Sequence, residues 1–296
     1  MNYYNEIKNK VVDNEIYCKT KDYSKDKNTI LTYYEIGKLL SGAGSKYGNN
    51  IIEEYSKKLQ IEVGKKYNKI TLFRMKQFYN VFNNEKVSPL ATQLTWSHYT
   101  ELLPIKDENE MLYYLNISIS QNLSRNDLRS KIKNKEYKRL PEETKIKLVN
   151  KEKTKVKDLV KNPILINNKN NYEVISEKIL QRLILEDIPS FLRELGPGFS
   201  FIDNEYKIKL GSTYNYIDLL LYNIEFNCYV VLELKVTVLK KEHIGQIEVY
   251  MNYIDNNLKK PNQNKTIGII ICKKNNKYVI EYCSDKRIIS KEYELV

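Results

Sequence analysis

Three charged residues interrupt two apolar segments of the chain. Asp218 lies in the stretch YIDLLLY, and Glu233 and Lys235 lie in the stretch VVLELKV. An ionised group is costly to bury without a partner, so these charges need a reason to be there. Because successive side chains of a strand point to opposite faces, Glu233 and Lys235 are predicted to share one face of their strand.

The two apolar segments are predicted to pair as a β-hairpin, with strands at 214–222 and 228–236 and a turn near 223–227. Asp218 would then approach Glu233 across the ladder, where opposed side chains are close. Two carboxylates repel each other, and a divalent cation between them removes the repulsion. Hard oxygen ligands of this kind suit Mg²⁺ or Mn²⁺. We therefore predict that Asp218 and Glu233 bind Mg²⁺, with Mn²⁺ able to substitute.

Lys235 adds a compact positive charge beside the carboxylates. It could orient or deprotonate a water, and it could stabilise charge on a phosphate. A divalent cation lowers the pKa of a bound water and neutralises phosphate charge, so the three residues together indicate a phosphodiester hydrolase centre. The alternative is an Asp218–Lys235 ion pair at a sheet edge with Glu233 in solvent, because a D…ExK pattern also arises by chance.

A helix predicted at 241–257 follows the second strand. Its spacing places Gln246, Tyr250 and Tyr253 on one face, where their polar tips could line the same pocket. Gln246 is therefore a candidate residue of this pocket, and Tyr250 is a candidate DNA contact. The alternative is that both tyrosines belong to the core.

The elements around the hairpin form a mixed α/β pattern. A helix at 176–195 has Ser176 as its N-cap, and Pro189 is predicted to kink or split it. The predicted element order is αβββαβ with one extra strand. The strands are expected at 199–209, 214–222, 228–236, 266–273 and 278–283.

The first part of the chain is predicted to be helical. Helical spacing of apolar residues runs through 28–83, with the first helix ending at Gly42. Further helices are expected at 107–120 and 124–139. Trp96 is expected to anchor the core, and His98 to have a structural role. Three short basic helices could form a helix-turn-helix-like DNA reader, or a plain bundle with a solvated basic face; the candidate DNA contacts are Lys65, Lys66, Arg74 and Lys76.

Residues 141–172 are rich in Lys and Asn, contain few apolar residues and include two prolines. This composition favours a linker. The predicted organisation is therefore a helical DNA-binding or assembly domain at 1–140, a linker at 141–172 and a catalytic domain at 173–296.

The composition limits the class of protein. The chain has 296 residues and a formal net charge of +12, a balance expected to attract nucleic acid. Four cysteines without CxxC spacing and two histidines argue against a zinc site. We expect a cytoplasmic protein without a membrane segment, because neither a signal peptide nor a long apolar run is present. The sequence contains no Gly-rich phosphate-binding loop, so we expect no small-molecule cofactor.

The carboxy-terminal half resembles the PD-(D/E)xK nuclease superfamily, and more narrowly the YhcG-type (DUF1016) nucleases. The resemblance is carried by FLRELGPGFSFI, YIDLLLYN, VVLELKV, GQIEVYMNYID and KKPNQNKTIGIIICK. The amino-terminal half is similar to the helical domain that accompanies this nuclease, through YYEIGKLL, YGNNIIEEYSKKL, MKQFYNVF, QLTWSHYTELL and NDLRSKI. Together these motifs cover the chain from about residue 25 to 290.

The resemblance implies a restriction-endonuclease-like αβββαβ core and divalent-metal cleavage of DNA. It assigns metal ligation to Asp218 and Glu233, with the backbone carbonyl of Leu234 as third ligand. Lys235 takes the role of the active-site lysine, and Gln246 that of the accompanying polar helix residue. Many relatives carry an acidic residue on the preceding helix. Here Gln181 stands at that position, so Glu177 or Glu186 substitutes or the acid is absent.

The motif and the resemblance together predict a DNA endonuclease, and the resemblance alone implies a setting in genome defence or DNA repair. The alternative is a catalytically inactive nucleic-acid-binding or assembly protein on a nuclease fold, for which the missing helix acid is the motive. A homodimer is expected, because cutting both strands of a duplex generally takes two active sites. The sequence does not tell which DNA structure or base sequence the protein prefers, or whether its substrate is DNA or RNA.

Overall fold

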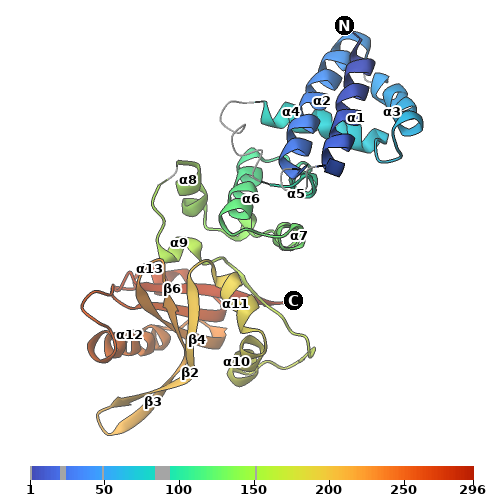
Figure 1. The fold of residues 1–296 in the computed structure, drawn as a ribbon. Helices are drawn as coiled ribbons and strands as arrows, with labels where there is room; N and C mark the ends of the chain where they lie inside the picture. Colours follow the sequence, from blue (N-terminus) through green and yellow to red (C-terminus); the bar gives the residue numbers. More distant parts are fainter. Residues whose placement is uncertain (1, 21–24, 49, 84–93, 151) are drawn as a thin grey trace. The chain divides into compact units, whose positions relative to one another are not determined.

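The computed structural model describes residues 2–20, 25–48, 50–83, 94–150 and 152–296. The chain divides into two compact units, Met1–Tyr137 and Lys138–Val296 (Figure 1). In the described residues, none of the helices combines the length and the apolar character needed to cross a membrane.

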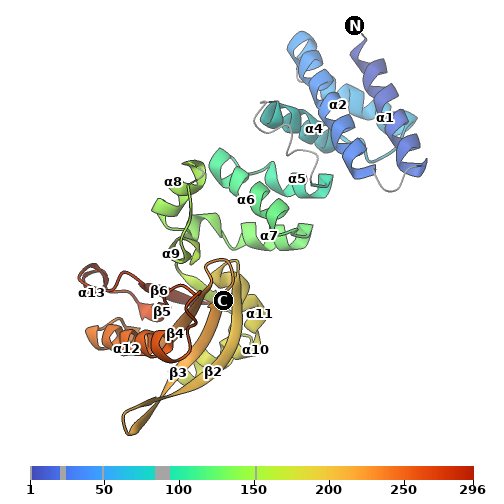
Figure 2. The same ribbon diagram turned by 60° about the vertical axis from the view of Figure 1, so that its left-hand side comes forward.

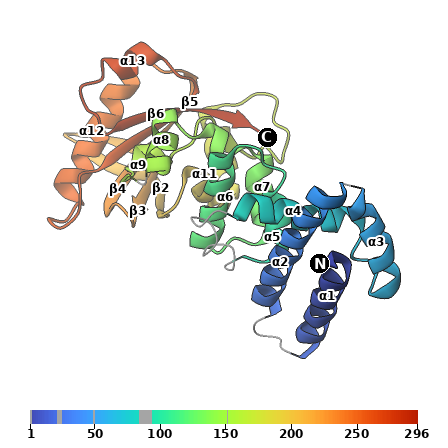
Figure 3. The ribbon, with the colours of Figure 1, turned by 90° about the horizontal axis from the view of Figure 1, so that it is seen from above.

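The first unit is helical, as the sequence predicts. Its helices are α1 (Tyr3–Thr20), α2 (Lys25–Tyr47), α3 (Ile51–Glu62), α4 (Lys69–Phe82), α5 (Trp96–Leu102), α6 (Glu108–Ser120) and α7 (Arg125–Lys133). The predicted helix end at Gly42 is wrong, because α2 continues to Tyr47. A Cβ at Gly42 would lie 3.1 Å from Tyr3 Oη, so close packing of α1 against α2 accounts for the glycine. The two helices lie side by side (Figure 3).

The core of the first unit is rich in aromatic side chains. The Trp96 ring meets Tyr33 edge-on at 4.9 Å and Phe78 at 5.6 Å between centroids, which confirms its predicted role as an anchor. His98 Nδ1 lies 2.8 Å from Thr95 Oγ1, and His98 Nε2 lies 2.9 Å from the Leu123 carbonyl oxygen. Both ring nitrogens are therefore engaged within the fold, as expected for a structural histidine.

The second unit is built on a six-stranded mixed sheet with strand order β1-β6-β5-β4-β3-β2. The strands are β1 (Ile164–Ile166), β2 (Phe199–Leu210), β3 (Thr213–Asn223), β4 (Cys228–Val238), β5 (Ile267–Lys274) and β6 (Ile288–Leu295). Neighbours β2, β3 and β4 pair antiparallel, whereas β4, β5, β6 and β1 pair parallel. The predicted fold class, a helical region followed by a mixed-sheet α/β domain, is confirmed.

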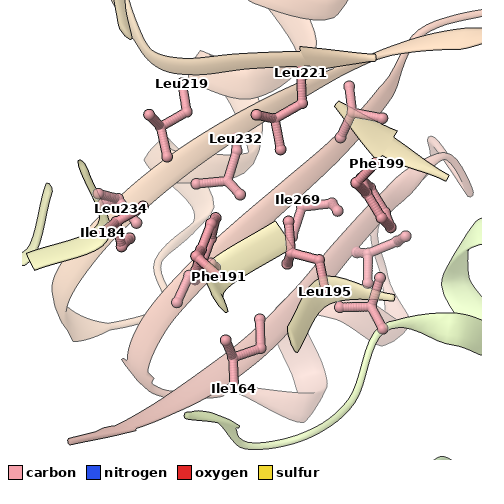
Figure 4. Close-up of a cluster of buried hydrophobic side chains, with 14 of the residues drawn as sticks. Ile164, Ile184, Phe191, Leu195, Phe199, Leu219, Leu221, Leu232, Leu234 and Ile269 are labelled. Carbon is pink, nitrogen blue, oxygen red and sulfur yellow. The ribbon is translucent and has the colours of Figure 1, made fainter. Parts of the chain in front are cut away.

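Helices cover both faces of this sheet. One face carries α10 (Glu177–Glu186) and α11 (Ile188–Leu195), which bury Leu232 and Leu234 of β4 in a continuous apolar core (Figure 4). The other face carries α12 (Lys241–Asn257), which packs on Val231 and its neighbours. The predicted break at Pro189 is confirmed, since α10 ends two residues before α11 begins. The remaining helices are α8 (Glu142–Asn150), α9 (Val156–Leu159) and α13 (Lys277–Glu281).

The hairpin of β2 and β3 extends beyond the rest of the sheet (Figure 2). The pairing of β3 with β4 runs from Asn223 to Leu219, whereas its pairing with β2 continues to Thr213. The outer half of the hairpin is therefore a two-stranded ribbon. A register shift between Phe201 and Asp203 precedes this outer half.

The predicted strand at 278–283 is wrong. Residues Lys277–Glu281 form the short helix α13, in which Tyr278 is 73% exposed, and the last strand of the sheet is β6. The run YVIEY has high β-propensity, but no neighbouring strand pairs with it, so propensity alone does not decide. The stretch predicted as a linker contains α8, α9 and β1, and Ile164 of β1 pairs with Tyr293 of β6.

Candidate active site

The candidate site lies where β3 and β4 part. Leu219 and Leu232 are the pair of the ladder nearest to it. Beyond this pair, the Leu234 N–H of β4 bonds to a side chain of β3 instead of its backbone. It donates a hydrogen bond of 2.8 Å to Asp218 Oδ2. The Asp218 N–H in turn points to Glu233 Oε1 at 3.5 Å. The predicted approach of Asp218 to Glu233 is thus present in the structure.

Lys235 lies against the same carboxylates. Its Nζ is 3.3 Å from Glu233 Oε2 and 3.6 Å from Glu177 Oε2. Glu233 is 1% exposed and Lys235 is 8% exposed. Glu233 is therefore not in solvent at a sheet edge. Its burial beside a second carboxylate is the expensive arrangement that the sequence indicates.

Burial and charge shift the acid–base equilibria of the site. Burial, with the nearby Asp218 charge, raises the pKa of Glu233 to about 8. Burial also raises the pKa of Asp218, even though the Leu234 N–H and Lys235 oppose the shift. Burial alone would lower the pKa of Lys235, but the carboxylates of Glu233, Glu177 and Asp218 together raise it. Ionising both carboxyl groups at once is therefore unfavourable between β3 and β4.

Helix α10 contributes two side chains. The Ser176 hydroxyl accepts a hydrogen bond of 3.2 Å from the Ile179 N–H and caps the helix, which puts Glu177 in the first turn beside Lys235. One turn later, Gln181 Nε2 donates to the Asp218 carbonyl oxygen at 3.1 Å. Glu186 ends the helix and accepts from Asn170 Nδ2 at 3.1 Å. Of the two substitute acids considered from the sequence, Glu177 is the one that contacts a residue of the site.

Gln246 and Tyr250 contact each other. Gln246 Nε2 donates to Tyr250 Oη at 3.1 Å, and Tyr250 is buried under α12 at 5% exposure. In the described part of the chain, neither residue forms a hydrogen bond or ion pair with Asp218, Glu233 or Lys235. Tyr250 belongs to the apolar core that α12 forms with the sheet.

Two further residues near the site escape the sequence reasoning. Glu205 lies opposite Asp218, because Leu219 pairs with Asn204 and Ile217 pairs with Tyr206. Its φ is +51°, and its charge raises the pKa of Asp218. His243, near the start of α12, has its pKa lowered by burial and by the Lys235 charge. No local motif marks either residue, because both positions depend on register and helix packing. A cavity of about 510 Å³ between α10 and β2 is lined by Gln181, Arg182 and Glu205, among others.

The donor set fits a hard divalent cation. The buried Glu233 carboxylate and the half-buried Asp218 carboxylate lie together with raised pKa values, which a bound cation would relieve. Strand geometry adds the Leu234 carbonyl: N–H and C=O of one residue point to the same side of a strand, and the Leu234 N–H faces Asp218. Within the described residues, no group of three or more His, Cys, Asp or Glu side chains is placed to hold a metal ion.

The basic residues proposed for DNA contact in the first unit have varied surroundings. Lys66 Nζ pairs with Glu15 and lies 5.3 Å from the centre of the Tyr67 ring. Lys65 and Arg74 are exposed, and Lys76 is half-buried. Their role in binding stays a prediction.

Family models match both parts of the chain. Residues 157–296 match the YhcG PDDEXK nuclease domain, and residues 15–139 match the DUF1016 N-terminal domain. The chain belongs to the YhcG (DUF1016) family of PD-(D/E)xK nucleases. Both the nuclease domain and the accompanying helical domain of this family are thus present, in the order expected from the sequence.

Individual relatives are distant. The chain is 21% identical over 291 residues to "Putative nuclease YhcG" of Escherichia coli (strain K12), covering 81% of this chain and 76% of that protein. Among solved structures, a repair endonuclease from Pyrococcus abyssi and an EndoMS–dsDNA complex each match with 20% identity and a TM-score of 0.29. Each match covers 43% of this chain and 48% of the other, so the chain spans about half the length of these structures.

Proposed function

We propose that this protein is a divalent-metal-dependent endonuclease that hydrolyses phosphodiester bonds in DNA. The observation that carries the proposal is the convergence of Asp218, Glu233 and Lys235 where β3 and β4 part. A buried and a half-buried carboxylate beside a single lysine leave one carboxylate without a counter-charge when both are ionised, which is costly. A site that awaits a cation and a phosphate accounts for the imbalance.

Asp218 and Glu233 would hold Mg²⁺, with the Leu234 carbonyl as the third protein ligand. When bound, the cation supplies Lewis acidity toward a phosphate and an activated water nucleophile at neutral pH. Mn²⁺, which favours the same oxygen ligands, should substitute.

The surroundings of Lys235 favour one of its two possible roles. The carboxylates of Glu233 and Glu177 lie 3.3 and 3.6 Å from its ammonium and favour the protonated form. A protonated lysine donates hydrogen bonds and stabilises negative charge, whereas a general base must first lose that proton. We therefore assign Lys235 to charge stabilisation on the phosphate, with Glu177 as a positioning residue that holds the ammonium from the other side.

DNA is the proposed substrate because the formal net charge of +12 favours a polyanion. Genome defence or DNA repair is the proposed setting, on the strength of the resemblance to the family. We also propose a homodimer, which would bring two sites to the two strands of a duplex.

The test is cleavage by the full chain of linear, nicked, forked and four-way-junction DNA with Mg²⁺ or Mn²⁺, beside an RNA of the same sequence. The wild type should cut DNA, and EDTA should stop it. Glu233→Gln removes one ligand charge with little change of shape and should reduce cleavage to background. Cleavage by Glu233→Gln at the wild-type rate would overturn the assignment.

One observation favours a second candidate, a nucleic-acid-binding protein without catalysis. Gln181 stands where many relatives carry an acid, and its amide is committed to the Asp218 carbonyl. That candidate predicts salt-sensitive DNA binding with no cleavage under any of the metal conditions. Any product that depends on Glu233 excludes it.

A further inference from the structure

The outer face of the β2–β3 ribbon carries two lysines and two tyrosines in cross-strand pairs. Lys207 pairs with Tyr216, and Lys209 pairs with Tyr214. Directly opposed residues of an antiparallel ladder point to the same face, so the four side chains form one strip. We call Lys207, Lys209, Tyr214 and Tyr216 the ribbon strip.

The exposure pattern fixes which face the strip occupies. Tyr214 is 54% exposed and Tyr216 is 52% exposed, and both lysines are exposed. The alternate residues Ile208 and Ile217 are 1% and 0% exposed and belong to the core beneath α12. The ribbon is therefore anchored by one face and presents the strip to solvent with the other.

The strip lies next to the candidate site along the chain. Tyr216 and Tyr214 precede Asp218 on β3 by two and four residues, which places them within roughly 7 and 14 Å of it along the strand. The charge of Glu205 acts on Asp218, as expected if the exposed face of β2 continues to the same point. A strand of nucleic acid held at Asp218 could thus extend along the ribbon over both tyrosines.

Lysine ammonium groups lie against the exposed Tyr214 ring. Lys207 Nζ lies over the Tyr214 ring, 3.9 Å from its centroid, and Lys209 Nζ lies 6.0 Å from the same point. Half of the Tyr214 surface nevertheless remains exposed. Lysines alone would merely keep an edge strand from pairing with other chains. Exposed aromatic rings interleaved with cations are instead the combination that binds single-stranded nucleic acid, through base stacking and phosphate attraction.

We propose that the ribbon strip binds an unpaired segment of DNA next to the bond to be cut, so that the enzyme prefers substrates with a single-stranded arm. This inference deepens the proposed function and rests on it for the position of the cut. A base within a duplex offers its faces to its neighbours, so only an unpaired base is free to stack on Tyr214 or Tyr216. The lysines would meet the phosphates of the same arm.

The test uses the full chain carrying Glu233→Gln, which blocks cleavage, and measures binding by fluorescence anisotropy at fixed salt without divalent metal. The ligands are a blunt duplex, the same duplex with a single-stranded overhang, and the overhang sequence alone as DNA and as RNA. The added double change Tyr214→Ala/Tyr216→Ala should weaken binding of the overhang and the single strand about 10- to 100-fold. Binding of the blunt duplex should change less than about twofold.

Two controls separate stacking from other effects. Tyr278→Ala/Tyr282→Ala removes two exposed tyrosines of the same unit, 73% and 80% exposed, and should leave all affinities unchanged. Tyr214→Phe/Tyr216→Phe keeps the rings and should bind like the parent. Equal losses on blunt and overhang DNA, tighter binding of the RNA, or a change of oligomeric state with the alanine variant would overturn the proposal.

The same variants in the active background test the link to cleavage. Tyr214→Ala/Tyr216→Ala should slow cutting of overhang DNA and spare cutting of the blunt duplex. The anisotropy result stands without any cleavage, so a protein that binds as expected but never cuts refutes the proposed endonuclease and not the ribbon strip. A protein that cuts normally while the alanine variant binds like its parent refutes the ribbon strip and not the endonuclease.

Discussion

Two buried lysines lie on opposite faces of the same sheet, Lys235 on β4 and Lys291 on β6, with 8% and 7% of their surface exposed. Lys235 has Glu233 and Glu177 within 3.3 and 3.6 Å, and its pKa is raised. Lys291 forms no ion pair among the described residues, and burial lowers its pKa to about 8.

The difference comes from the partners rather than from depth. The charge of Asp158 raises the pKa of Lys291, but burial lowers it by more. Asp158 already binds Lys147 Nζ at 2.8 Å and the Lys155 N–H at 2.7 Å. The cost of desolvating the Lys291 ammonium is therefore hardly compensated by carboxylates. At Lys235, the neighbouring carboxylates more than compensate for burial and favour the charged form. We therefore expect Lys235 to act in the proposed active site and Lys291 to lower the stability of the fold.

Matched Lys→Met substitutions give the largest contrast. Lys235→Met should lower the rate of DNA cleavage by about 100-fold or more, because it removes a charge aimed at the developing negative charge of the phosphate. Lys291→Met should leave the rate unchanged. Steady-state cleavage of one labelled substrate by both variants measures the contrast, and equal rates for the two would remove its basis.

The same pair should differ in stability with opposite signs. At pH 7, Lys291→Met is expected to raise the free energy of unfolding of the second unit by about 1–3 kcal/mol, because an apolar side chain replaces a buried, poorly paired charge. Lys235→Met should lower it, since Glu233 and Asp218 lose their counter-charge. Urea titration followed by circular dichroism measures both. A loss of stability in Lys291→Met would mean that its ammonium has a favourable role.

The pH dependence sharpens the assignment to Lys291. Its folded-state pKa of about 8 lies below the ordinary 10.5, so between these values the unfolded chain binds more protons. Stability must then rise with pH across this interval. The advantage of Lys291→Met should be full below about pH 8 and should fade toward pH 10.5. Urea midpoints of wild type and variant, compared at each pH, cancel the titration of all other groups. A constant difference would contradict the lowered pKa.

Glu177→Gln is expected to have the smallest effect. The Glu177 side chain is 46% exposed and its ion pair with Lys235 is 3.6 Å long, and such pairs contribute at most about 1 kcal/mol. The cleavage rate should fall by no more than about 5-fold, the kinetic equivalent of that energy. Complete loss of activity would instead make Glu177 the helix acid that binds the metal.

Much of the sheet follows from local pattern. Four of the predicted strands, 199–209, 214–222, 228–236 and 266–273, agree with β2 to β5 within two residues at each end. Alternation in VVLELKV puts Leu232 and Leu234 in one core and the charged pair on the other face. Strand β1 and strand β6 escaped prediction, because Ile164 and Tyr293 pair over a long stretch of chain. Helix α13 was predicted as a strand, because the local sequence does not show that its residues lack a pairing strand.

By itself the sequence predicted that a hairpin brings Asp218 toward Glu233 and that alternation puts Lys235 on the face of Glu233, with an Asp218–Lys235 ion pair at a sheet edge as the alternative. It also determined the helical first unit and the break at Pro189. Only the tertiary structure decided that Glu177 meets Lys235 while Gln181 meets the Asp218 backbone. Both lie on one helix, one turn apart, and the packing of α10 on the sheet selects which partner each side chain reaches. The ribbon strip was likewise decided in three dimensions, because cross-strand register and a shared exposed face are properties of paired strands.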